Sequence, residues 1–130
     1  MRPEGHLKLA RAYRLKGWLD RALAELRLTL PEAKSVPHSP YFQKVRSEIF
    51  FESGLTHEQK QNISKAIEAY LKALSLQPRN GDAHRHLTKA FFQQGEYGRA
   101  LEHALRANEL GSPIDPSLLQ NIRDKARAIR

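Results

Sequence analysis

The chain has 130 residues and a mass of 14.9 kDa, which is enough for one domain with a hydrophobic core and too short for two ordinary ones. Its 40% apolar and 28% charged residues argue against extensive disorder. The net charge of +8 and a pI near 10.0 favour anionic partners, and the absence of cysteine excludes disulfides, thiolate metal sites and cysteine nucleophiles.

The N-terminal segment is amphipathic and charged throughout, so it lacks the apolar core of a secretory signal. No stretch approaches the roughly 18 apolar residues of a membrane span. We therefore expect a cytoplasmic protein without a membrane span. This expectation applies to a complete chain and not to a fragment of a larger protein.

The first predicted unit, about residues 3–36, consists of two helices separated by a glycine. Leu9, Ala10 and Tyr13 lie at helical spacing on one face of the first helix, before Gly17. Glycine can adopt the left-handed conformation that ends a helix. The second helix carries three apolar residues on its inner face: Leu19, Ala22 and Leu26.

The same pattern returns twice further along the chain. In the third unit, about residues 81–113, Leu87, Thr88 and Phe91 precede Gly95 with the same steps. Its second helix carries Tyr97, Ala100, Ala104 and Ala107. The segment KAIEAYLKALSLQP carries Ala66, Tyr70 and Ala73, and Ala66 lies 34 positions before Ala100. The small alanines predict sites where two helices cross closely.

The middle unit, about residues 39–80, is longer between its glycine and its first alanine. Ala66 follows Gly54 by 12 positions, whereas the corresponding step is 5 in the other two units. In the register that we prefer, the first helix starts after Ser39 as N-cap and ends at Gly54. An insertion near residues 55–61 then lengthens the hairpin tip. A helical apolar stripe supports this register: Tyr41, Phe42, Val45, Ile49 and Phe50.

A second register remains open for this unit. A strict 34-residue frame extends the first helix to Lys60 and makes Phe50 and Gly54 early positions of that helix. It places Ser53 and His57 where the core requires a large apolar and an aromatic residue, which is why we prefer the first.

A seventh helix is predicted at about residues 115–129, with Asp115 as N-cap and Pro116 in the first turn. Its apolar residues lie on one side, so it would cover the exposed flank of the third unit: Leu118, Leu119, Ile122, Ala126 and Ile129. Repeat arrays need such a cap, because each unit buries its faces only against its neighbours.

These features resemble the tetratricopeptide repeat (TPR) family, whose unit is about 34 residues of two antiparallel helices. The resemblance rests on the large, small and aromatic triplet of the first helix, the glycine, the alanines of the second helix and the closing Pro78. It implies an all-α fold of about seven helices, a right-handed superhelical array of antiparallel helix pairs, with residues 1–130 as a single TPR domain.

In this family the first helices line a concave groove that binds ligands. The resemblance therefore implies a set of groove residues from the three first helices: Leu7, Arg11, Arg14, Tyr41, Lys44, Glu48, Phe51, Asp82, Arg85, Lys89 and Phe92. Several cations beside large apolar groups suit an acidic peptide or helix. Trp18 is a possible additional anchor on the surface.

One TPR subclass grips the C-terminal carboxylate of chaperones through lysine, asparagine and arginine residues. This sequence departs from that pattern, because Leu7 and Arg11 occupy the places of the lysine and the asparagine. No catalytic constellation is predicted either. His84 and His86 point to different faces of a helix, and the remaining histidines have no metal-ligand spacing.

The sequence thus predicts a non-enzymatic adaptor without cofactor or metal, which binds a segment of another protein in its groove. The high pI keeps nucleic-acid binding as the alternative, although no basic run with interleaved aromatic residues is present. A third hypothesis is that the array is one module of a longer scaffold or associates with itself.

Overall fold

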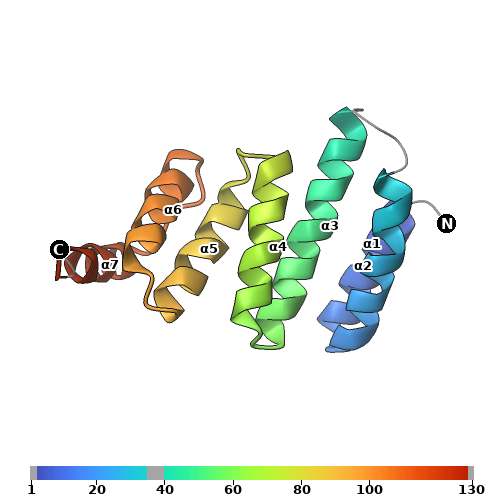
Figure 1. Ribbon diagram of the computed structural model, residues 1–130, viewed down its shortest axis with the longest axis horizontal. Coiled ribbons are helices and arrows are strands. Elements are labelled where there is room, and N and C mark those ends of the chain that lie inside the picture. Colours follow the sequence, from blue (N-terminus) through green and yellow to red (C-terminus); the bar gives the residue numbers. More distant parts are fainter. Residues whose placement is uncertain (1–2, 35–39, 129–130) are drawn as a thin grey trace. The chain divides into compact units, whose positions relative to one another are not determined.

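The structure of the protein is a computed structural model that describes residues 3–34 and 40–128. These residues form seven helices and no strand (Figure 1). The helices are α1 (Pro3–Leu15), α2 (Leu19–Lys34), α3 (Pro40–Gln59), α4 (Ile63–Leu76), α5 (Gly81–Gln93), α6 (Tyr97–Glu109) and α7 (Pro116–Ala128). The prediction of an all-α protein built from helix pairs is confirmed.

The helices form two compact units, Met1–Pro78 and Arg79–Arg130. In the first unit, α1 pairs with α2 and α3 pairs with α4, while α1 and α2 both contact α3. In the second unit, α5 pairs with α6, and α7 packs on α6 (Figure 1). Each pair is a helical hairpin with a short turn, as the repeated sequence pattern predicts.

The first and third hairpins turn at the predicted glycines. Gly17 and Gly95 have φ angles of +83° and +77°, a conformation that a residue with a Cβ adopts only at a cost. In both turns the amide after the glycine donates to the carbonyl five residues earlier, at 2.8 and 2.9 Å. This bond is typical of the Schellman motif that closes a helix.

The middle hairpin has the same turn without a glycine. Gln61 adopts a φ of +63°, and the amide of Asn62 donates to the carbonyl of His57 at 2.9 Å. His57 therefore takes the place that Phe91 takes in the third hairpin, 34 positions later. The turn follows the strict 34-residue frame and not the register preferred from the sequence.

The expected end of α3 at Gly54 is wrong, and so is the insertion at the hairpin tip near residues 55–61. The chain remains helical as far as Gln59. Helix α3 has 20 residues and α5 has 13, so α3 is seven residues longer. The alignment of the turns places these seven residues at the N-terminal end of α3, in Pro40–Arg46. The expected N-cap Ser39 lies outside the described residues.

Gly54 has a packing role in the middle of α3. A Cβ added there would lie 2.4 Å from Cε1 of Tyr70, so the close approach requires a residue without a side chain. The ring of Tyr70 is fully buried, and its hydroxyl donates to Oε1 of Glu58 at 2.9 Å. Burial and the carboxylate of Glu58 raise the pKa of the Tyr70 hydroxyl above its usual range.

The alanines that define the repeat lie in the helix interfaces. Six of them have no exposed surface: Ala22, Ala66, Ala73, Ala100, Ala104 and Ala107. A methyl group allows two helix backbones to approach closely while larger residues fill the space beside them. The interpretation of these alanines as contact positions is confirmed.

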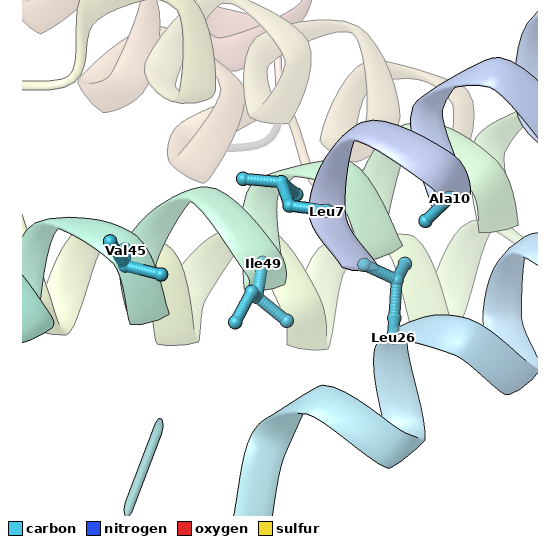
Figure 2. Packing of buried hydrophobic residues seen from close by; sticks show 5 residues of the cluster. All are labelled: Leu7, Ala10, Leu26, Val45 and Ile49. Carbon is cyan, nitrogen blue, oxygen red and sulfur yellow. The ribbon is translucent and has the colours of Figure 1, made fainter. Parts of the chain in front are cut away.

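A cluster of five apolar side chains joins the first three helices (Figure 2). Leu7 and Ala10 come from α1, Leu26 comes from α2, and Val45 and Ile49 come from α3. All five are at most 4% exposed. This cluster includes Val45 from the additional N-terminal segment of α3, so that segment contributes to the core of the first unit.

Helix α7 covers one flank of α6 in the second unit. Ile122 of α7 is fully buried, and Leu118 and Leu119 pack against a cluster that contains Ala104 and Ala107 of α6. At the start of α7, the side chain of Asp115 accepts the amide of Ser117 at 2.9 Å. This is the hydrogen bond expected of an N-cap residue.

Candidate interaction surfaces

Two of the expected groove cations are held by a buried carboxylate of α3. Arg14 donates through Nε to Oε1 of Glu52, and Nε of Arg11 lies 3.4 Å from Oε2 of the same carboxylate. The side chain of Glu52 is only 2% exposed. Arg14 also donates to Oε1 of Gln59 at 2.9 Å. The two arginines therefore join α1 to α3, and half of the Arg11 side chain remains exposed.

Leu7 does not lie on an open surface, contrary to expectation. It is 4% exposed and belongs to the apolar cluster between α1, α2 and α3. Because α1 contacts α3 directly, the face of α1 on which Leu7 lies is covered.

The four residues proposed from α3 divide between its two parts. Tyr41 and Lys44 lie in the additional N-terminal segment, and both are exposed. Glu48 and Phe51 lie in the part that corresponds to the other first helices, and both are partly buried. The ring of Phe51 packs against Tyr70, with ring centroids 5.6 Å apart.

The residues expected from α5 lie at spacings of three, four and three, so they share one helix face. Asp82 accepts a hydrogen bond from Ser112 at 2.9 Å and lies 3.5 Å from Nη2 of Arg85. Lys89 is exposed, and Phe92 is partly buried. This face therefore combines cations, a carboxylate and an aromatic ring.

The ring of Phe92 also contacts neighbouring helices of its unit. It packs edge-on against Tyr97 of α6, with ring centroids 5.6 Å apart. The ammonium of Lys125 in α7 lies 5.4 Å from the Phe92 centroid and 5.3 Å from that of Tyr97. A basic residue of the capping helix is thus placed beside an expected groove residue.

Trp18 is 47% exposed at the tip of the first hairpin. Its ring packs on Tyr13, with centroids 5.8 Å apart. The cations of Lys16 and Arg21 lie 5.0 and 5.2 Å from its centroid. The tryptophan therefore folds over its own hairpin while one part of its surface stays open to solvent.

The structure pairs two histidines that lie 19 positions apart in the sequence. Nδ1 of His84 in α5 lies 2.9 Å from Nδ1 of His103 in α6, and the ring of His103 stacks on Phe91. Burial lowers the pKa of His103, and the neighbouring His84 lowers it further. Among the described residues, no group of three or more potential metal ligands is present.

A cavity of about 180 Å³ opens between α2, α3 and α4, where the sequence predicts no site. Its apolar part includes Leu23, Leu26 and Ile49, and its polar part includes His57 and three basic residues of α2 and α4. No sequence signal identifies this cavity, because its lining comes from three helices in both repeats of the first unit.

A family model described as TPR repeat matches residues 54–95. The matched segment runs from Gly54 of α3 to the turn glycine Gly95, so it includes all of α4 and α5. Residues 54–95 of this chain are therefore similar to a TPR repeat. No curated protein matches this chain by sequence.

Solved structures show the same fold at low sequence identity. The first TPR of Spaghetti (RPAP3), bound to the HSP90 peptide SRMEEVD, is 15% identical, with a TM-score of 0.72 over 98% of this chain and 93% of that one. A mutant of MamA is 22% identical, with a TM-score of 0.50 over 92% and 79% of the two chains. Among the described residues of this chain, no helix is long and apolar enough to cross a membrane.

Proposed function

We propose that this chain is a non-enzymatic adaptor that binds an extended or helical segment of another protein on the first helices of its repeats. The TPR fold supports this proposal, and the RPAP3 structure with the same fold is bound to a peptide. The helices are held by buried packing before any ligand arrives, so little ordering entropy would be lost on the receptor side.

The strongest support for the proposal comes from one face of α5. Arg85, Lys89 and Phe92 follow one another at spacings of four and three, and Lys89 is exposed. Two cations beside an aromatic ring suit a partner segment that presents a carboxylate and an apolar side chain. In the first unit we assign the corresponding role to Tyr41, Lys44 and Phe51.

We do not propose a clamp for the C-terminal carboxylate of chaperones. Leu7 is buried where that clamp needs a lysine, and Arg11, where it needs an asparagine, lies against Glu52. The peptide in the RPAP3 structure is therefore not assigned to this protein. We infer an acidic partner only from the cations of this chain.

The proposal is tested with peptides selected from a random dodecapeptide library on the wild-type protein. We expect Arg85→Glu with Lys89→Glu to weaken binding of the groove-directed peptides about tenfold or more, and rising salt to weaken their binding to the wild type. The matched control reverses two exposed cations elsewhere, Arg106→Glu with Arg127→Glu, and should bind as the wild type does. The proposed groove would be refuted if all selected peptides bound the α5 variant with the same affinity as the wild type.

Nucleic-acid binding is the alternative, and it rests on the net charge of +8. Against it, several cations already lie beside carboxylates, including Arg14 at Glu52, Lys60 at Asp20 and Arg106 at Glu109. Fluorescence polarisation with mixed RNA and DNA fragments separates the two functions. Tight binding that falls steeply with salt would favour nucleic acid over a protein partner. Sedimentation at increasing concentration tests self-association.

A further inference from the structure

The cavity between α2, α3 and α4 lies wholly within the first unit, and part of its lining is apolar. Leu23, Leu26, Ile49 and Ala69 line it and are each at most 7% exposed. Phe50 adds a partly exposed ring. An apolar cavity of about 150 Å³ can hold a benzene molecule, so a cavity of about 180 Å³ has room for a large apolar side chain.

The charged residues at the cavity are mostly basic. Arg27 comes from α2, and Lys65 and Lys72 come from α4, all three exposed. Glu68 is the one carboxylate among the lining residues that the structure describes. The ammonium of Lys72 lies 5.6 Å from the centroid of Phe50, which places a positive charge directly beside the apolar part of the lining.

His57 adds a polar atom that has no hydrogen-bond partner among the described residues. Its Nδ1 is buried, and His57 is one of the residues that line the same cavity. Burial lowers the pKa of His57, and the nearby Lys65, Lys60 and Arg27 lower it further, against the opposing effect of Glu68. The ring is therefore neutral near pH 7 and adds no positive charge to the cavity.

We propose that this cavity is a second protein-binding site, which takes an acidic peptide segment with a large apolar side chain next to a carboxylate. The apolar side chain enters the cavity beside Phe50 and Ala69, and the carboxylate lies near Lys65 and Lys72. Charge complementarity selects such a segment over a basic or neutral one. This site uses residues of α2, α3 and α4 and none of α5, so it does not depend on the proposed α5 face.

The test uses the full chain and the same random dodecapeptide library. We expect one class of selected peptides to combine a carboxylate with a neighbouring leucine or phenylalanine. These peptides should lose about tenfold or more in affinity for Lys65→Glu with Lys72→Glu, both at exposed positions. They should bind Arg85→Glu with Lys89→Glu as they bind the wild type, which separates this site from the proposed groove.

A second variant tests the cavity without changing its charge. Ser53 lines the cavity, and Ser53→Leu would occupy part of its volume. We expect it to abolish binding of the same peptides, while thermal unfolding shows that both variants remain folded. The proposal is overturned if no such class of peptides is enriched, or if the enriched peptides bind the α4 charge variant as tightly as the wild type.

Discussion

Gly54 shows at the residue scale why a glycine inside a helix can be required. The glycine lies against the ring of Tyr70, which is fully buried and held by its hydrogen bond to Glu58. Alanine is the better helix former by about 1 kcal/mol, so an exposed glycine at this position would be a weakness. Here the close contact reverses that preference.

We therefore predict that Gly54→Ala lowers the free energy of unfolding by about 1–2 kcal/mol, because overpacking outweighs the gain in helix propensity. Chemical denaturation monitored by circular dichroism measures the change. The control is Gly98→Ala in α6, where an added Cβ meets nothing within 4 Å and stability should rise or stay constant. A Gly54→Ala protein as stable as the wild type would show that Tyr70 can move aside.

The pair formed by His84 and His103 makes stability depend on pH. The pKa of His103 is lowered in the folded protein by burial, by His84 and by Arg99, against the opposing charge of Glu102. Below the unfolded value of about 6.5, the unfolded chain then binds more protons than the folded one. The stability present above pH 6.5 is therefore lost as the pH falls toward the folded pKa, and His57 contributes with the same sign.

We predict that the free energy of unfolding falls between about pH 7.5 and pH 5.5, and that His103→Gln makes this fall smaller because glutamine does not titrate. Urea denaturation at both pH values measures it. His86→Gln, at a partly exposed position of α5, is the comparison variant and should keep the wild-type dependence. An unchanged slope in the His103 variant would assign the pH dependence to other groups.

Interactions between elements decide how α1 is attached to α3. Glu52 is buried, and it holds Arg11 and Arg14 across the contact between these helices. Removing the carboxylate would leave the partly buried Arg14 without its charged partner. We predict that Glu52→Ala lowers the free energy of unfolding by about 2–3 kcal/mol, less than for a fully buried pair because Arg11 is half exposed.

Denaturation of the variant and of Lys60→Ala tests this prediction. Lys60 pairs with the exposed Asp20 at 2.5 Å, so its loss should change stability little. Equal effects of the two variants would mean that Glu52 contributes no more than an exposed ion pair.

At the scale of the helices, local sequence signals predicted the wrong register for α3. An apolar stripe followed by Gly54 indicates a helix end, because glycine is the usual residue there. The actual turn uses Gln61 in a left-handed conformation, at a position where the other repeats have glycine. The contact of Gly54 with Tyr70 and the turn hydrogen bonds determine the register, and both involve residues outside the apolar stripe.

At the scale of the whole molecule, the cations that the structure describes differ in their surroundings. Arg11, Arg14 and Lys60 lie beside carboxylates of the first unit, whereas Lys89, Arg27 and Lys72 lie on exposed surfaces. The net charge therefore predicts that anions are attracted to the protein. The position of each cation relative to the carboxylates determines whether it is available to bind anions.

The sequence by itself determined that the chain is a helical repeat protein, where the alanine contacts lie and that Gly17 and Gly95 close their helices. These features depend on spacings of three and four residues and on the conformational freedom of glycine, which are local properties. Only the tertiary structure decided the register of α3, the burial of Leu7, the pairing of Arg14 with Glu52 and the cavity beside His57. Each of these depends on contacts between residues that are far apart in the chain, which local spacing does not encode.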